Sequence, residues 1–161
     1  MIRSRVSCSA GGVMLLLILS FMLPSAVTAG AAIGPRAGYD FDSEKFVLGA
    51  EAELGRAFQE FRLAPSIDLE LGDNTATALN ADFRLYLFHL PDTGLRFYGS
   101  AGPTLFIASA GHGDTQTELG LSLVGGMKIP MKGQRRYNLE VRFGVGDIPD
   151  LKIMLTILFG I

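Results

Sequence analysis

The chain has 161 residues, of which 48% are hydrophobic and only 19% are charged, and its formal net charge at pH 7 is −2. A chain this apolar is not intrinsically disordered, and its length fits a single domain. It carries 14 basic and 16 acidic residues, so it lacks the basic excess that nucleic-acid-binding proteins usually show. Composition therefore excludes a disordered chain and predicts no nucleic-acid partner.

The N-terminal segment has the pattern of a secretory signal peptide. Arg3 and Arg5 precede the apolar run VMLLLILSFML, and the small residues of PSAVTAG follow it. This order of a basic region, an apolar region and a small-residue cleavage site predicts cleavage near Ala29. The alternative is a retained membrane helix, for which the apolar run is short. We therefore expect residues 1–29 to be removed and residues 30–161 to form the mature domain.

The mature domain would contain no cysteine, because Cys8 lies within the predicted signal peptide. Without a thiol it can form neither a disulfide nor a thiolate metal site. Removal of Arg3 and Arg5 leaves 12 basic and 16 acidic residues, a formal net charge of −4. We expect the mature domain to hold no cofactor and no metal.

The mature sequence alternates apolar and polar residues in eight segments, which predicts β-strands. Short stretches rich in Gly, Asp, Asn and Pro separate them, as β-turns require. Because the connections are short, neighbouring strands would be antiparallel and follow an up-and-down order. The segment 54–61, LGRAFQEF, is the exception and predicts either one helical turn or a longer connection. The predicted strands are residues 33–41, 45–54, 61–71, 77–88, 95–107, 117–129, 137–146 and 151–161.

Each predicted strand separates its side chains into an apolar and a polar face. In LNADFRLYLF, residues 79–88, apolar side chains alternate with a polar set that includes Asp82 and Arg84. No charged residue falls on the apolar face of any of the eight segments. A slip of one residue would exchange the two faces, so the alternation specifies the register of the strands.

The composition of the polar face predicts that this face lines the interior of a barrel. It combines many glycines with equal numbers of acidic and basic residues and favours Arg over Lys, whereas a solvated surface is rich in Lys and Glu. The lumen of an eight-stranded barrel is just wide enough to be filled by side chains. The predicted interior charge network consists of Arg36, Glu51, Glu53, Arg62, Asp68, Glu70, Asp82, Arg84, Arg96, Glu118, Lys128, Glu140, Arg142 and Lys152.

The apolar face would then contact the hydrocarbon of a bilayer. Tilted strands of about 9–11 residues cross a membrane, and a closed sheet pairs every backbone polar group there. The sequence therefore predicts an all-β, eight-stranded antiparallel up-and-down transmembrane β-barrel. The residues predicted to face lipid are Leu69, Phe83, Leu85, Leu121, Leu123, Val141, Phe143, Ile157 and Phe159.

The stretches GPRAGYDFDSEKFVLGAEAELG, LAPSIDLELGDN, LNADFRLYLF and YGSAGPTLFI resemble bacterial outer-membrane β-barrel proteins with eight strands. The resemblance covers essentially the whole mature domain, whose architecture is similar to the small barrels of the OmpA and OmpX type. It implies a location in the outer membrane of a Gram-negative bacterium, with outer-membrane lipid and lipopolysaccharide as neighbours. It also implies insertion by the barrel-assembly machinery, which reads an apolar C-terminal strand end. Phe159 has the expected face, but the last residue is Ile161 rather than the usual Phe.

Barrels of this size include lipid A-modifying enzymes, and such an enzyme would need catalytic side chains such as histidine or paired carboxylates. Neither His89 nor His112 is followed two residues later by a serine, the spacing of a deacylase-type site. His112 with Asp114 offers two potential ligands, too few for a closed metal site. Two pairs of carboxylates, Glu51 with Glu53 and Asp68 with Glu70, suit either acid–base chemistry or an ion-paired interior. We favour the ion-paired interior. We expect no catalytic residue.

The leading hypothesis is a non-enzymatic integral outer-membrane barrel with a structural role or a minor role in transport or interaction. One alternative is a soluble periplasmic β-barrel whose apolar face encloses a lipid, because soluble barrels alternate in the same way. The other is a lipid A-modifying barrel enzyme with a site at the rim. The sequence leaves the oligomeric state, the ligand and the physiological process open.

Overall fold

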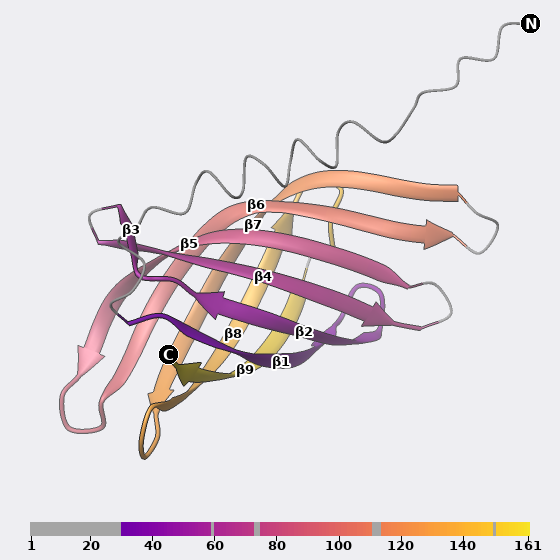
Figure 1. Cartoon of the computed structure of the whole chain (residues 1–161). Helices are drawn as coiled ribbons and strands as arrows, with labels where there is room; N and C mark the ends of the chain where they lie inside the picture. The colour runs from indigo at the N-terminus through magenta and orange to yellow at the C-terminus, as the bar shows by residue number, and fades with distance from the viewer. Residues whose placement is uncertain (1–29, 59, 73–74, 111–113, 150) are drawn as a thin grey trace, which may run out of the picture.

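The computed structural model describes residues 30–58, 60–72, 75–110, 114–149 and 151–161, which are nearly all in β-strands (Figure 1). Among these residues, no helix is long and apolar enough to cross a membrane. The predicted signal peptide lies outside the described residues and stays a prediction. The strands are β1 (Ala32–Asp40), β2 (Lys45–Glu53), β3 (Arg56–Phe58), β4 (Phe61–Leu71), β5 (Ala76–Leu90), β6 (Leu95–Ala110), β7 (Asp114–Pro130), β8 (Arg135–Val145) and β9 (Leu151–Gly160).

The eight long strands close into one antiparallel barrel. Each pairs with its neighbours in chain order, β9 pairs with β1, and β2 pairs with β4. The closing contacts are regular, with Ala37 opposite Leu155 and Leu48 opposite Leu69. Closure leaves no sheet edge along the wall, which removes the unpaired backbone groups that an open sheet exposes. The predicted eight-stranded up-and-down barrel is confirmed.

The short strand β3 replaces the helical turn considered for residues 54–61. It pairs with the start of β4, with Arg56 opposite Arg62 and Phe58 opposite Phe61. The pairing of β2 with β4 ends at Glu51 and Ser66, so the first residues of β4 need another partner. A strand of three residues provides backbone hydrogen bonds there, whereas so short a helix would carry the full cost of nucleation.

Three strands are longer than predicted and extend beyond the barrel wall. β5, β6 and β7 have 15, 16 and 17 residues. Pairing of β4 with β5 ends at Arg62 and Arg84, so the last six residues of β5 have a partner only in β6. Pairing of β7 with β8 reaches only Leu121 and Val145, so the start of β7 is paired only with β6. The β5–β6 and β6–β7 hairpins therefore project from opposite ends of the barrel.

We name the two ends of the barrel by their position relative to the chain. The terminal rim is the end where Ala32 lies opposite Gly160; it includes β3 and the β5–β6 and β7–β8 turns. The distal rim carries the β1–β2, β4–β5, β6–β7 and β8–β9 connections. In Figure 1 the terminal rim is on the left and the distal rim on the right.

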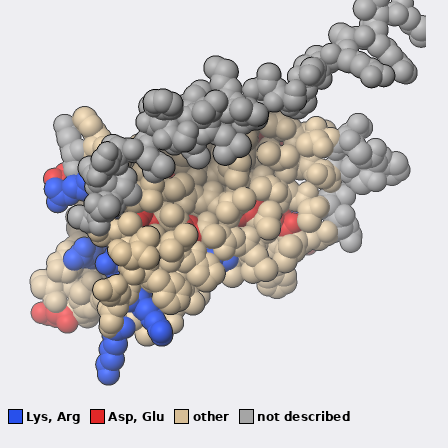
Figure 2. Space-filling model, in the orientation of Figure 1, with Lys and Arg blue, Asp and Glu red and all other residues tan. Residues whose placement is uncertain are grey.

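The polar face lies inside the barrel and the apolar face outside. On β7, the inward-facing Ser122 is 1% exposed, whereas its neighbour Leu123 is 51% exposed. Figure 2 shows the same arrangement, with a side wall that is almost free of charged atoms. A water-soluble protein buries its large apolar side chains and exposes its charges. This barrel does the reverse.

Glycine makes room for large side chains in the lumen. A Cβ atom built on Gly126 of β7 would lie 2.3 Å from the Tyr98 ring of β6. These two residues are directly opposite in the β6–β7 ladder. Tyr98 thus occupies the inward space that Gly126 leaves free, and it is almost fully buried.

Candidate functional site

The distinctive site of the molecule is the charged interior of the barrel. Inward positions on seven strands carry acidic or basic side chains that are at most 5% exposed, because alternate residues of a strand point to the same face. β6 contributes the neutral polar side chains of Tyr98, Ser100 and Thr104 instead. The buried charged residues are Arg36, Asp40, Glu51, Glu53, Asp68, Glu70, Asp82, Arg84, Lys128, Glu140, Arg142 and Lys152.

Arg84 of β5 is the centre of this network. Its Nη2 atom lies 2.9 Å from Glu51 Oε1 and 2.6 Å from Glu140 Oε1, and its Nη1 atom lies 3.0 Å from Glu53 Oε2. Its guanidinium also stacks over the Tyr98 ring, 4.1 Å from the ring centroid. One cation therefore joins β2, β5 and β8 across the lumen, with the planar geometry that suits Arg for such contacts.

Arg36 of β1 forms a second hub toward the distal rim. It lies 3.3 Å from Glu51, 3.2 Å from Asp68 and 3.2 Å from Glu140. Arg36 and Arg84 thus share both Glu51 and Glu140. Tyr98 donates a hydrogen bond of 2.6 Å to Glu140, so the carboxylate between the two hubs is also held by a neutral donor.

Further ion pairs continue the network toward both rims. Near the terminal rim, Glu53 pairs with Lys128, which also bonds the Tyr86 hydroxyl, and with Arg62 at 3.2 Å. Toward the distal rim, three more pairs are buried: Arg142 with Asp82 at 2.5 Å, Lys152 with Glu70 at 2.5 Å, and Lys152 with Asp40 at 3.5 Å.

A neutral layer of hydrogen bonds crosses from β4 to β7. Asn80 donates to Ser66 and to Asp68, each at 3.0 Å. The Thr104 hydroxyl donates to Asn80 at 2.8 Å and lies 2.6 Å from the Ser122 hydroxyl. These short side chains suit a part of the lumen where no long side chain is needed to bridge the strands.

The arrangement leaves each buried carboxylate with a cationic partner. Asp40, Glu51, Glu53, Asp68, Glu70, Asp82 and Glu140 each have a Lys or Arg nitrogen within 4.0 Å. Burial of a charge is costly unless it is paired and hydrogen-bonded, and here the ion pairs offset that cost. Asp40 Oδ2, Asp68 Oδ1 and Arg84 Nε are nevertheless buried without a hydrogen-bond partner among the described residues. Chemically, the lumen holds carboxylates that are neutralised rather than poised for proton transfer.

Two of the residues predicted for the network lie apart from it. Arg96 is exposed, because it lies on the part of the β5–β6 hairpin that projects past the terminal rim. Glu118 is half-buried at the distal rim, on the part of β7 that β8 does not reach. Neither forms an ion pair with another described residue. Strand parity assigns both to the inner face, but the wall does not extend far enough to enclose them.

The network also contains residues that the sequence analysis did not single out. Tyr86, Tyr98 and Asn138 bond its carboxylates, and Thr156 donates a hydrogen bond of 3.2 Å to Glu51. All four share the parity of the charged residues on their strands. Their position on the inner face could be predicted from this parity, but an uncharged side chain gives no indication in the sequence that it bonds a buried carboxylate.

The residues predicted to face lipid all lie on the outer wall. Leu69, Phe83, Leu121, Leu123, Phe143 and Phe159 are exposed, and Leu85, Val141 and Ile157 are intermediate. The intermediate values reflect cover by neighbouring side chains on the same wall, since these residues share the parity of the exposed set.

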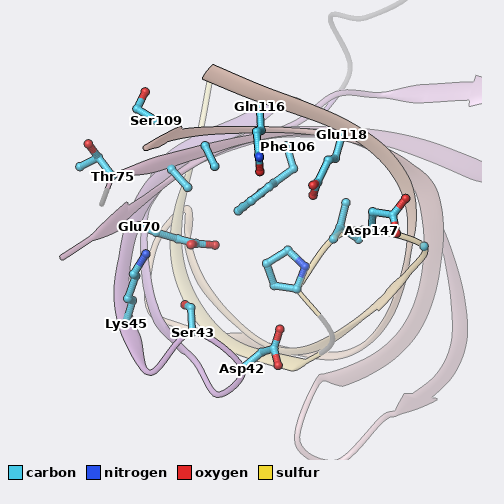
Figure 3. A pocket seen from close by; sticks show the side chains of 15 residues that line it. Asp42, Ser43, Lys45, Glu70, Thr75, Phe106, Ser109, Gln116, Glu118 and Asp147 are labelled. Atoms are coloured by element: carbon cyan, nitrogen blue, oxygen red, sulfur yellow. The ribbon is translucent and has the colours of Figure 1, made fainter. Parts of the chain in front are cut away.

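The β8–β9 connection folds over the distal end of the lumen. Ile148 is buried, and Cβ atoms built on Gly120 or Gly144 would lie 2.8–2.9 Å from its side chain. Beside it lies a cavity of about 520 Å³. Figure 3 shows Phe106, Gln116 and Glu70 pointing into this space from the surrounding strands. The lumen is thus narrowed at the distal rim by an apolar side chain from a loop.

The candidate enzymatic and metal groups are not assembled into a site. His89 is exposed near the end of β5, whereas His112 lies outside the described residues. In the described part of the chain, no group of three or more His, Cys, Asp or Glu side chains is placed to hold a metal ion. Among the described residues, the ion-paired lumen is therefore the most extensive arrangement of charged side chains.

Comparison with known proteins identifies solved structures with a similar fold. No family model and no curated protein matches the sequence. Three solved structures are similar. The N-terminal β-barrel domain of Pseudomonas aeruginosa OprF is 16% identical with a TM-score of 0.69, covering 84% of this chain and 99% of that one. Neisserial surface protein A is 12% identical with a TM-score of 0.58, covering 82% and 95%. Ail, the attachment invasion locus protein of Yersinia pestis, is 13% identical with a TM-score of 0.51, covering 81% and 95%.

These likenesses define the class of the molecule. The chain has the fold of the small eight-stranded outer-membrane β-barrels, as the resemblance in its sequence predicted. At identities of 12–16% they describe the fold alone.

Proposed function

We propose that this chain is an integral outer-membrane protein whose sealed, non-enzymatic barrel serves as a structural element of that membrane. The observation that carries the proposal is the inverted wall: large apolar side chains are exposed around a lumen of buried, paired charges. An exposed apolar surface of this extent needs a hydrocarbon environment or a partner to cover it. A bilayer covers the whole circumference, which fits the presence of at least one exposed large apolar side chain on each of the eight long strands.

The contacts across the lumen support a barrel that does not conduct. Arg84 and Arg36 bridge strands on different sides of the interior, and Ile148 narrows the distal end. Side chains fill the lumen of a small barrel rather than leaving a channel. In planar bilayers, we expect the purified mature protein to give no sustained channel current; regular open-channel steps would contradict the sealed lumen.

Membrane integration is tested by cell fractionation. The folded protein should remain in the outer-membrane fraction after a carbonate wash, and its gel mobility should change on boiling, because a closed barrel resists unfolding by detergent. Release into the periplasm by osmotic shock would contradict the proposal. It would favour the soluble lipid carrier, although the apolar face of this barrel points outward and leaves the lumen polar.

The absence of enzymatic activity is proposed on the pairing of the lumenal carboxylates and the exposed position of His89. Replacement of both histidines, His89→Ala with His112→Ala, should leave the lipid A composition of the host cell unchanged. A change in acylation that depends on either histidine would assign the chain to the lipid-modifying class instead.

We further propose that the terminal rim faces the periplasm, the side from which an exported chain enters the outer membrane, because the first and last strands begin and end there at Ala32 and Gly160. Residues 30–161 contain no cysteine. A single introduced cysteine can therefore be labelled to report the orientation without background labelling. Glu44→Cys at the distal rim should react with an impermeant maleimide on intact cells, whereas Lys132→Cys at the terminal rim should react only after the outer membrane is opened. The opposite result would invert the orientation.

A further inference from the structure

A groove on the terminal rim has the chemistry of a phosphate site. It encloses about 380 Å³ and includes Arg56 of β3, Glu60, Arg62 of β4, the end of β5 around Phe88 and His89, and Arg96 of β6. We propose that this terminal groove binds the phosphate of an anionic phospholipid from the periplasmic leaflet of the membrane. The proposal rests on the membrane location and orientation proposed above.

The groove exists because two hairpins of unequal length meet at the rim. β5 continues for six residues beyond Arg84, its last partner in β4. The chain before β4 turns aside into β3 rather than continuing along β5. The projecting β5–β6 hairpin and the β3–β4 hairpin therefore form two walls with an open space between them, and the backbone of β5 is unpaired on that side.

The charges in the terminal groove are unbalanced. Arg56 and Arg96 form no ion pair with another described residue, and Arg62 pairs only with Glu53, at 3.2 Å. Glu60 is the one acid among the residues that line the groove. This contrasts with the lumen, where each buried carboxylate has a cationic partner. Two free guanidinium groups supply the planar sets of donors that phosphate oxygens accept.

Apolar side chains flank the charged groups. Phe58 is 65% exposed beside Arg56, and Phe88 is 67% exposed one residue before His89. Leu87, the extra residue of the bulge between Tyr86 and Phe88, is also exposed. Aromatic side chains are typical of the level where a barrel meets lipid headgroups. A phospholipid satisfies both parts of the site, with its phosphate at the arginines and an acyl chain along these residues.

The opposite rim has the opposite charge. Among the described residues, Asp42, Glu44 and Asp147 are exposed at the distal rim. The Lys and Arg side chains visible in Figure 2 gather mainly at the left end, which is the terminal rim. Attraction of an anionic headgroup is therefore specific to one end of the barrel, and in the proposed orientation this end lies in the phospholipid leaflet.

The competing explanation is a diffuse positive rim without a defined site. Lys132 and Arg135 are exposed on the β7–β8 hairpin of the same rim and do not line the groove. They provide a matched control, since their removal lowers the rim charge by the same amount. A true site depends on Arg56 and Arg96 and not on this pair.

The experiment measures lipid retained by the refolded mature protein in detergent, by native mass spectrometry with phosphatidylglycerol or phosphatidylcholine. We expect selective retention of phosphatidylglycerol. Arg56→Gln with Arg96→Gln should lower it about threefold or more, because each exposed charge contact contributes modestly. Lys132→Gln with Arg135→Gln should leave it nearly unchanged. Equal loss in both double variants, or no selectivity in the original protein, would overturn the proposal.

Two further arms remove ambiguity. Glu60→Gln should increase the retention of phosphatidylglycerol, a gain that a misfolded protein cannot produce; an unchanged or lower retention would count against the groove. Excess inorganic phosphate should not displace the lipid, because the acyl chain also contributes; full displacement would make free phosphate the ligand and overturn the lipid assignment. Each variant is checked for heat-dependent gel mobility, so loss of the barrel is recognised separately from loss of the site.

Discussion

Ser122 and Leu123 are neighbours on β7, yet their surroundings are opposite. Ser122 lies in the lumen and shares a hydrogen bond with Thr104, whereas Leu123 stands on the outer wall between Ala101 and Phe143. Ion pairs and hydrogen bonds fill most of the inside, together with a few buried apolar side chains such as Met154 and Leu158, and apolar side chains cover the outside. The comparison teaches that the two faces contribute differently: lumenal hydrogen bonds and ion pairs link strands across the interior, and the apolar wall suits the barrel to a bilayer.

The largest expected effect comes from removal of the central cation. Arg84→Ala would leave Glu51, Glu53 and Glu140 with fewer partners in a buried interior. Loss of one partner from a buried ionic group costs about 3–5 kcal/mol. The free energy of unfolding in phospholipid vesicles, measured by urea titration with gel mobility as the readout, should fall by that amount.

The control for Arg84 is Arg96, which carries the same group in an exposed position. Arg96→Ala should change the free energy of unfolding by less than about 0.5 kcal/mol. Similar losses at the two positions would mean that the lumenal contacts contribute no more than a surface charge.

The second prediction concerns the wall. Leu123→Arg places a charge on the lipid-facing side of a central strand, which costs about 2–4 kcal/mol at the bilayer midplane. Phe46→Arg, close to the distal end of β2, should cost less than about 1 kcal/mol because charge is tolerated near the interface. The same urea titration gives both values. Equal tolerance of arginine at the two depths would argue that no bilayer surrounds the wall.

The third prediction compares two adjacent glycines on opposite faces of β7. Gly126→Ala would drive a methyl group into the Tyr98 ring, whereas nothing lies within 4 Å of a Cβ atom built on Gly125. Overpacking of this kind costs about 1–3 kcal/mol. We expect Gly125→Ala to leave the free energy of unfolding nearly unchanged. If Gly125→Ala were the more harmful of the two, the assignment of the faces would be reversed.

Much of this architecture was predictable because alternation of apolar and polar residues identifies both strands and faces. It placed Arg84, Glu140 and ten further predicted charges on the inner side, and all nine predicted lipid-facing residues on the outer side. The residues at which the strands end were harder to predict from the sequence. β5 continues through His89 to Leu90, beside a turn motif, whereas the pattern ends this strand at Phe88.

The partners within the lumen could not be predicted from single strands. Arg84 meets Glu140, 56 positions later in the chain, because the stagger of all the strands around the barrel determines which inward residues share a level. The fit of Tyr98 into the space at Gly126 likewise depends on the β6–β7 register. The terminal groove was missed for the same reason, since it arises where β5 outruns β4 and not from a local motif.

The smallest loss predicted for a lumenal side chain tests whether the neutral layer of the lumen behaves like the charged part. Ser122→Ala removes one hydroxyl from the chain of hydrogen bonds through Thr104 to Asn80. Thr104 still donates to Asn80, so no charge is left without a partner, and the free energy of unfolding should fall by only about 1 kcal/mol. A loss as large as that of Arg84→Ala would mean that the neutral layer, and not the ion pairs, holds the strands in register. Ser122 and Leu123 are adjacent and lie at nearly the same depth in the barrel. A difference in the loss of unfolding free energy between Ser122→Ala and Leu123→Arg therefore reports which face each side chain occupies, and not how far along the barrel it lies.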